Sequence, residues 1–413
     1  MIRRLITIGG IIAGVFTAVW DLLSRRSVEA RQDQAEGACW WRRLLKLAAL
    51  LAALAFGGLL VATSGIIPIK ASSGHWPITA WFLHFSMQRS VATHTLGLTA
   101  PALDEPSYVL KGAGHYETGC APCHGSPTLS LPRIPQRMTP PPPHLAQTIS
   151  MWEAEELFYI VKHGVKFTGM PAWPAQQRDD EVWALVAFLR KLPGLDAESY
   201  QRLVHGEASA HSAVPPFAGL LPPEQVPRAV SESCARCHGV DGHGRESAFP
   251  KLAGQRFDYL FASLQAFARG ERQSGMMEPI AASFSLEELR ELARYYSSLE
   301  VKRPAPPRPE LTSNIQRGET IAQRGIPSQH VPACAACHGP NGVNRNSFYP
   351  ELAGQHTDYL VLHLTLFKQG YRGGTAYAHL MRPVVESLTA EQMRDVALFY
   401  AWPQGSATGV TSN

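Results

Sequence analysis

The feature that most constrains this chain is a five-residue motif of two cysteines and a histidine, which occurs three times. The copies are Cys120-Ala-Pro-Cys123-His124, Cys234-Ala-Arg-Cys237-His238 and Cys334-Ala-Ala-Cys337-His338. This spacing is typical of covalent c-type haem attachment, in which two thiols bind the porphyrin and the adjacent histidine is placed to ligate the iron. The sequence therefore predicts three covalently bound haem c groups, each with one iron.

A zinc site, a redox dithiol and a structural disulfide are the competing interpretations of the motif. Zinc sites with this spacing usually pair two such units within about 20 residues. Here the first cysteines of successive copies are 114 and 100 residues apart, and no thioredoxin-like βαβ pattern surrounds them. Haem attachment is the favoured interpretation. It leaves Cys39 outside the motifs, and we expect this residue to be an inert thiol.

The N-terminal part contains two uncharged runs. Residues 47–67 form a run of 21 residues, long enough at about 1.5 Å per residue to cross a hydrocarbon core of about 30 Å. This run predicts a transmembrane helix. Residues 5–20 form a shorter run, and the sequence leaves open whether it is a second span.

The distribution of basic residues predicts the orientation of this anchor. The connector between the two runs is rich in Arg and Lys, which favours the cytoplasmic side and places everything after residue 67 in the periplasm. A signal cleaved near residue 20 would reverse this orientation. We reject that alternative because haem is normally attached outside the cytoplasmic membrane. We expect a protein of the bacterial inner membrane that contacts lipid.

Two further observations concern partners. Residues 71–105 carry aromatic clusters such as Trp81-Phe82 that predict an interfacial linker at the membrane surface. His75 and His84 in this linker could instead belong to a quinone or partner-subunit surface.

The net charge of the chain, +4, is too small to indicate nucleic acid as a partner.

The second half of the chain contains an internal repeat. Residues 250–255 (Pro-Lys-Leu-Ala-Gly-Gln) recur as residues 350–355 (Pro-Glu-Leu-Ala-Gly-Gln), at the same offset of 100 residues as the motifs. The offset then becomes 104, so that Met277 aligns with Met381. These are two copies of one domain. The first unit is more distant and has Met170 at the corresponding place.

Each unit has the same order of a helix, the motif, a loop-rich middle, a methionine and a closing helix with apolar residues at helical spacing. Proline-rich connectors separate the units. We therefore predict a mainly α fold in which an N-terminal transmembrane anchor precedes three tandem domains. The predicted ranges are 1–70 for the anchor, 71–105 for the linker, and 106–205, 218–302 and 311–404 for the domains.

Residues 106–404 resemble the class I cytochrome c family. Residues 218–404 are similar to the dihaem cytochromes of the c-four type, and the front unit, with Gly169-Met170-Pro171, resembles monohaem domains. The resemblance implies that methionine sulfur is the sixth iron ligand opposite each histidine. The implied pairs are His124 with Met170, His238 with Met277, and His338 with Met381.

Two details of these sites stay open. Met276 is a rival to Met277, and the register favours Met277 because Pro279 then aligns with Pro383. Four basic residues before the methionines are either partners of the haem propionates or solvated helix ends. These residues are Arg269, Arg272, Lys368 and Arg372.

The resemblance implies an electron-transfer protein without catalytic residues of its own. We expect it to relay single electrons between respiratory partners, from a quinol-oxidising complex or a dehydrogenase toward a terminal oxidase. One alternative is the cytochrome subunit of a membrane-bound alcohol or sugar dehydrogenase. Another is a haem peroxidase, which needs an open sixth position, whereas every unit here offers a methionine.

Overall fold

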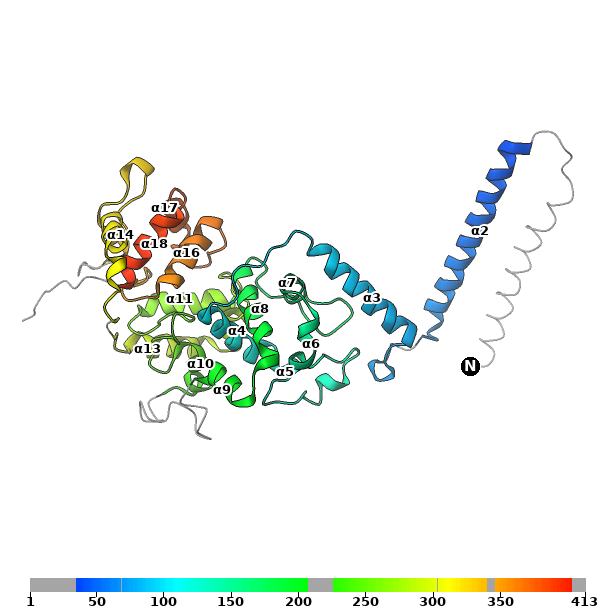
Figure 1. The fold of residues 1–413 in the computed structure, drawn as a ribbon, viewed down its shortest axis with the longest axis horizontal. Helices are drawn as coiled ribbons and strands as arrows, with labels where there is room; N and C mark the ends of the chain where they lie inside the picture. The colour runs from blue at the N-terminus through cyan, green and yellow to red at the C-terminus, as the bar shows by residue number, and fades with distance from the viewer. Residues whose placement is uncertain (1–34, 68, 207–225, 303, 340–345, 403–413) are drawn as a thin grey trace, which may run out of the picture. The chain divides into compact units, whose positions relative to one another are not determined.

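The structure is a computed structural model that describes residues 35–67, 69–206, 226–302, 304–339 and 346–402. It divides the chain into two compact units, Met1–Ser73 and Gly74–Asn413. The regular structure of the described residues is helical, with two isolated β-bridges beside the helices (Figure 1). The predicted mainly α fold is confirmed.

The first unit contains the long helix α2, Ala35–Ser64, and the short helix η2, Ala71–Ser73. The stretch Trp41–Ser64 of α2 has 24 residues and a mean hydropathy of 2.3, which makes it long and apolar enough to cross a membrane. The helix ends before the predicted boundary at residue 67 because Gly65 adopts a left-handed φ of 69°. The run 5–20 lies outside the described residues.

The second unit begins with α3, Pro77–His94, which covers about half of the predicted interfacial linker. Proline at its first position suits a helix start, since that position needs no backbone N–H. Trp81, Phe82 and Phe85 are exposed on this helix, and the rings of Trp81 and Phe85 stack. Contact of this helix with lipid stays a prediction.

We call residues 106–205 domain 1. Tyr116, Leu185, Phe188 and Tyr200 are fully buried in its core, which α4, α8 and α9 surround. The elements of domain 1 are α4 Pro106–Gly119, α5 Ala121–His124, η3 Pro135–Arg137, α6 Leu145–Thr148, η4 Ile149–Met151, α7 Ala154–His163, α8 Asp179–Lys191, η5 Leu192–Gly194 and α9 Ala197–His205.

We call residues 218–302 domain 2, of which the part before residue 226 lies outside the described residues. Apolar side chains from α11 and α13 form its core around Tyr296. The elements of domain 2 are η8 Val230–Cys234, α10 Ala235–His238, α11 Phe257–Ala268, α12 Met277–Ala282 and α13 Leu286–Ser298.

We call residues 311–404 domain 3. Its core has two neighbouring groups of apolar side chains, one beside the closing helix and one beside Met381. The elements of domain 3 are η9 Pro309–Leu311, α14 Thr312–Arg324, η10 Pro327–Gln329, α15 Ala335–His338, α16 Thr357–Gln369, η11 Ala378–Leu380, α17 Met381–Val385 and α18 Ala390–Ala401.

The repeat predicted from the sequence appears as matching helices. Helices α11, α12 and α13 of domain 2 correspond to α16, α17 and α18 of domain 3. Both closing helices begin with a capping box, formed by Ser285 with Glu288 and by Thr389 with Gln392. These reciprocal hydrogen bonds satisfy backbone N–H groups at the helix start. The same sequence signal therefore fixes where α13 and α18 begin.

In domains 1 and 3 the first and closing helices cross at a glycine. A methyl group on Gly112 of α4 would lie 2.0 Å from the Ala184 carbonyl oxygen of α8. A methyl group on Gly318 of α14 would lie 2.0 Å from the Asp395 carbonyl oxygen of α18. Both helix pairs therefore depend on direct backbone approach.

We expect Gly318→Ala to lower the free energy of unfolding of domain 3 by roughly 1–3 kcal/mol, the usual cost of overpacking. Guanidinium titration followed by circular dichroism measures the change. Gly373→Ala is the matched control, because a methyl group there meets no atom within 4 Å. Equal stability of the two variants would contradict the close crossing.

Candidate haem-binding sites

The three motifs have one local geometry. Each forms a single helical turn whose first cysteine is the N-cap: α5, α10 and α15. The two cysteines are three residues apart and the histidine follows at four, so all three side chains lie on one side of the turn. Each turn ends at a glycine with positive φ: Gly125 (69°), Gly239 (77°) and Gly339 (83°). A side chain is disfavoured in this left-handed backbone.

The six cysteines of the motifs are free thiols, so the competing disulfide interpretation finds no support among the described residues. Burial raises the pKa of Cys120 and of Cys234 to about 12, and that of Cys237 to about 11. A buried, protonated thiol is a poor redox nucleophile, because attack requires the thiolate. Thiols in apolar surroundings do fit attachment to a porphyrin.

Each motif histidine is held by a proline carbonyl. The Nδ1 atoms lie 2.9 Å from the Pro143 carbonyl oxygen for His124, and 3.1 Å from those of Pro250 and Pro350 for His238 and His338. An Nδ1–H that donates to a carbonyl leaves Nε2 with the lone pair that binds iron. Burial also lowers the pKa of His124 and His238, which favours the neutral ring that a metal requires.

A tyrosine hydroxyl holds the glycine after each motif, and this role was missed from the sequence. The hydroxyl groups of Tyr116, Tyr296 and Tyr400 donate to the carbonyl oxygens of the three glycines, at 2.6, 3.1 and 3.0 Å. Tyr296 and Tyr400 come from closing helices, whereas Tyr116 comes from α4, before its motif. The 104-residue offset between Tyr296 and Tyr400 could have indicated the shared role.

The three candidate methionines have similar surroundings. Met170, Met277 and Met381 are each partly buried against the core of their own domain. A cavity of about 500 Å³ is bordered by donors of domains 2 and 3 together: Cys234, Cys237, His238, Met277, Cys334, Cys337, His338 and Met381. The structure thus brings these two donor sets into one space. The candidates of domain 1 do not border it.

Packing separates Met277 from its rival Met276. Both residues border the cavity, but Met276 is buried in the core of domain 1, with its sulfur 4.0 Å from the position of a methyl group on Gly119. Met277 instead packs against the core of domain 2. This difference favours Met277 as the donor paired with His238.

The four basic residues divide into two kinds. Arg269 is exposed and pairs with Glu271, and Lys368 donates to the Leu388 carbonyl oxygen. Arg272 and Arg372 border the cavity and face domain 3 and domain 2, respectively. Arg272 donates to the Tyr359 hydroxyl at 3.3 Å and Arg372 to the Tyr259 hydroxyl at 3.1 Å. Of the four residues, only Arg272 and Arg372 border the cavity, where they could meet haem propionates.

A pair of glutamines links the two sites across the interface between domains 2 and 3. The Gln355 side chain bonds both backbone groups of Lys251, at 3.0 Å each. The Gln255 side chain does the same to Glu351, at 2.8 and 2.9 Å. Lys251 and Glu351 directly follow Pro250 and Pro350, whose carbonyl groups hold the histidines. Each domain therefore stabilises the backbone that holds the histidine of the other domain.

Domain 1 lies directly against the motif of domain 2. A methyl group on Gly114 of α4 would lie 3.4 Å from the Cys237 sulfur and 2.9 Å from the Phe249 ring. The Arg245 guanidinium donates to carbonyl oxygens in the last turn of α9, including that of Val204 at 2.6 Å. Domain 2 therefore contacts both other domains.

His115 of α4 is a buried histidine at this junction. Its ring lies beside Trp173, and its Nδ1 has no hydrogen-bond partner among the described residues. Burial, followed by the nearby charge of Lys111, lowers the pKa of His115 to about 3, with Arg178 acting in the same direction and Asp180 opposing it. The ring is therefore neutral over the physiological range.

This histidine predicts acid lability of the fold. Its folded-state pKa lies below the ordinary 6.5, so the unfolded chain binds the proton first and stability falls as pH drops from about 6.5 toward 3. The slope for one proton reaches about 1.4 kcal/mol per pH unit. We expect His115→Phe to reduce this loss, measured as the thermal midpoint at about pH 7 and about pH 5. His84→Gln, at an exposed position, should leave the pH dependence as it is.

The residues present fit a covalently attached haem, because free thiols, an oriented imidazole and a thioether are available in each domain. When bound, such a haem supplies one-electron iron chemistry. The residues of the chain would attach it, ligate its iron and exclude water. Helices arranged around a thiol–thiol–histidine turn and a methionine loop define a c-type cytochrome.

Comparison with known proteins agrees with this class. The family described as cytochrome c oxidase, cbb3-type, subunit III matches residues 108–189 and 221–295, and the family described as cytochrome c matches residues 315–401. The chain belongs to the cytochrome c family, and it is a multihaem c-type cytochrome of electron transfer.

Curated relatives match a little under half of the chain. A protein named thiosulfate dehydrogenase electron acceptor from Thiomonas intermedia is 34% identical over 190 residues, which cover 46% of this chain and 84% of the relative. Cytochrome c4 of Azotobacter vinelandii is 33% identical over 186 residues, 42% of this chain and 83% of the relative. The solved structure of reduced cytochrome c4 from Pseudomonas stutzeri matches at 31% identity with a TM-score of 0.38, covering 41% of this chain and 92% of that one. The predicted resemblance to c-four-type cytochromes is confirmed.

Proposed function

We propose that this protein is a trihaem cytochrome anchored in the bacterial inner membrane, which relays single electrons between respiratory partners on the periplasmic side. The observation that carries the proposal is the threefold recurrence of one donor geometry. In each domain two thiols lie beside a histidine whose Nδ1 is held by a proline carbonyl. Three domains in the ranges given above would each bind one haem.

The proposed ligand sets follow from this geometry. The thiols attach the porphyrin, the histidine Nε2 is the proximal ligand, and a methionine sulfur completes the coordination. A neutral thioether favours reduced iron and so raises the reduction potential, which suits transfer toward a terminal oxidase. The sets are Cys120, Cys123, His124 and Met170; Cys234, Cys237, His238 and Met277; and Cys334, Cys337, His338 and Met381.

The apolar helix α2 supports the membrane anchor. Its stretch Trp41–Ser64 is long enough to span a bilayer and its residues are exposed rather than packed in a core. Basic residues at its start, Arg42, Arg43 and Lys46, favour a cytoplasmic N-terminal end. The haem domains would then lie in the periplasm.

The comparisons support two kinds of partner. The match to an oxidase subunit family over domains 1 and 2 favours transfer toward a terminal oxidase. The relative named as an electron acceptor of thiosulfate dehydrogenase favours a second candidate function, in which this chain accepts electrons as the cytochrome subunit of a substrate dehydrogenase. An alcohol or sugar dehydrogenase would be a partner of the same kind.

Membranes that contain the full chain test the proposal. We expect the protein to stay with the membrane after an alkaline carbonate wash, and its haem domains to be digested by protease added to spheroplasts. Added quinol should reduce the haems and oxygen should reoxidise them, both followed by haem absorption. Cyanide, which blocks a terminal oxidase, should keep the haems reduced. Release by carbonate would contradict the anchor.

Gentle solubilisation separates the two candidate functions. Co-elution with an oxidase, or reoxidation by one, supports the relay. Co-elution with a dehydrogenase whose substrate reduces the haems without added quinol supports the second candidate. Peroxide turnover or a high-spin ferric signal would contradict both.

A further inference from the structure

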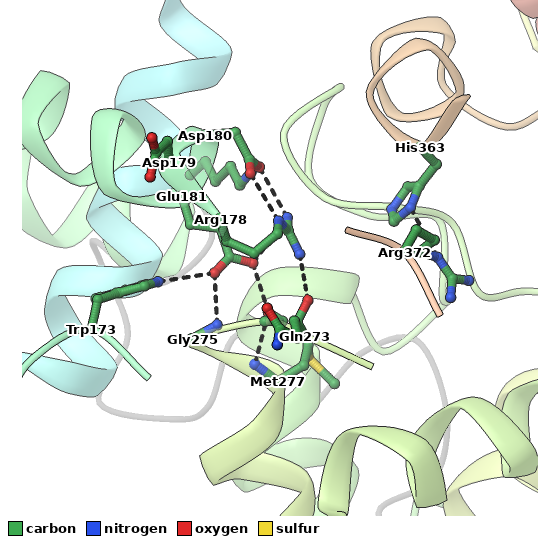
Figure 2. Close-up of polar contacts among 12 residues, drawn as sticks. Trp173, Arg178, Asp179, Asp180, Glu181, Gln273, Gly275, Met277, His363 and Arg372 are labelled. Atoms are coloured by element: carbon green, nitrogen blue, oxygen red, sulfur yellow. Dashed lines mark hydrogen bonds and ion pairs between the residues drawn. The ribbon is translucent and has the colours of Figure 1, made fainter. Parts of the chain in front are cut away.

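The loop that leads to Met277 in domain 2 is held by side chains of domain 1. This loop, residues 273–277, lies against the start of α8 (Figure 2). The first turn of α8 carries three acidic residues, Asp179, Asp180 and Glu181, which suit the positive end of a helix dipole. One of them, Glu181, is only 3% exposed and points into the loop.

Both oxygens of the Glu181 carboxylate accept hydrogen bonds from the loop. Its Oε1 accepts from the Ser274 hydroxyl at 2.7 Å, and its Oε2 accepts from the Gly275 backbone N–H at 2.7 Å. The Trp173 indole N–H donates to Oε2 at 3.2 Å. Hydrogen bonds to a buried charged group are stronger than neutral ones, and losing this partner leaves three buried donors unsatisfied.

Arg178 completes the clamp. Its guanidinium lies 3.0 Å from Glu181 Oε1 and donates to the Gln273 carbonyl oxygen at 2.8 Å. Asp180 holds the same guanidinium through two contacts, at 2.8 and 2.9 Å. A carboxylate and a guanidinium of domain 1 thus bind successive residues of the domain 2 loop.

The clamp continues to the methionine itself. The Ser274 hydroxyl that donates to Glu181 also accepts from the Met277 backbone N–H, at 3.2 Å. Gly275 lets the Trp173 indole pack directly on the loop, because a methyl group there would lie 2.1 Å from the indole nitrogen. The position of Met277 is therefore connected to Glu181 through one serine.

Domain 3 lacks this arrangement although it carries the same repeat. At the 104-residue offset, Ala378 and His379 replace Ser274 and Gly275, so that the hydroxyl link and the close indole contact have no counterpart there. The clamp is thus a property of domain 2 that depends on the presence of domain 1.

We propose that Glu181 of domain 1 is a positioning residue for Met277, so that docking of domain 1 sets the ligation and the reduction potential of the haem in domain 2. This inference rests on the proposed function, in which Met277 is the sixth ligand. Iron–thioether bonds are weak, and groups that hold a ligand in place tune both its binding and the potential of the metal.

The test compares the full-length haem protein with Glu181→Ala and Glu181→Gln. Two readouts serve: the shifted NMR methyl signals of iron-bound methionines in the reduced state, and a redox titration of each haem. Met277→Leu identifies which signal belongs to domain 2. We expect Glu181→Ala to lose or broaden that signal and to lower the potential of that haem alone, with a smaller shift for Glu181→Gln.

Asp395→Asn is the matched control, since Asp395 is equally buried but pairs with Arg317 inside domain 3 and touches no methionine loop. It should leave the domain 2 signal unchanged. If Glu181→Ala does not accumulate, the same two readouts are taken from Glu181→Gln alone.

Unchanged signals and potentials in the Glu181 variants, with three methionine signals in the parent protein, would contradict the positioning role of Glu181 and leave the ligand assignment intact. Absence of the domain 2 signal from the parent protein would overturn the ligand assignment as well.

Discussion

Replacing Cys234 and Cys237 together by alanine is expected to lower covalently bound haem from three groups per chain to two. Both thioether bonds of domain 2 disappear, and His238 alone offers one coordination bond. Intact mass of the purified protein gives the number of attached porphyrins, and the pyridine haemochrome spectrum gives the haem content independently. No other single motif removal is expected to disturb its neighbours as much, because domain 2 contacts both other domains.

Cys39 provides the control for this loss. It belongs to α2 and to none of the motifs, so Cys39→Ala should retain all three haems. Three attached haems in the double alanine variant would contradict attachment at the second motif. Loss of haem in the Cys39 variant would show that the cysteine content, rather than the motif, controls maturation.

Met277→Leu and Met276→Leu are expected to differ sharply although the residues are neighbours. Met277→Leu should remove one of three iron-bound methionine signals and lower the potential of the haem in domain 2, because the thioether ligand is lost. Met276→Leu should keep all three signals. Met276→Leu should lower the free energy of unfolding by less than about 1.5 kcal/mol, as other volume-conserving changes in a core do.

The physical basis for this difference is the packing of the two side chains. Met276 fills the core of domain 1 and Met277 faces the core of domain 2. Redox titration and NMR of the reduced protein measure both variants. Loss of a methionine signal in Met276→Leu, with retention in Met277→Leu, would reverse the assignment.

Much of the local architecture could be predicted from the sequence because its signals are local. The capping boxes at Ser285 and Thr389, the amphipathic closing helices and the 104-residue offset all depend on residues close in the chain. The motif itself fixes the spacing of two thiols and a histidine. The apolar run near residue 50 likewise predicts a long helix, and α2 lies there.

Contacts between distant segments could not be predicted in the same way. Glu181 is one of three acidic residues at a helix start, yet its partners, Ser274 and Gly275, are more than 90 residues away. The reciprocal Gln255 and Gln355 contacts were visible only as a repeated sequence. Tyr116 takes from α4 the role that closing-helix tyrosines have in the other domains. Such roles depend on domain docking, for which one sequence carries no periodic signal.

The haem content of the full-length protein, measured together with its reactive thiols, tests the central claim most directly. Purified from a host that attaches haem, the chain should contain three haems by pyridine haemochrome and one thiol that reacts with an alkylating reagent after denaturation, namely Cys39. Fewer than three haems per chain, or alkylation of any motif cysteine, would contradict the account.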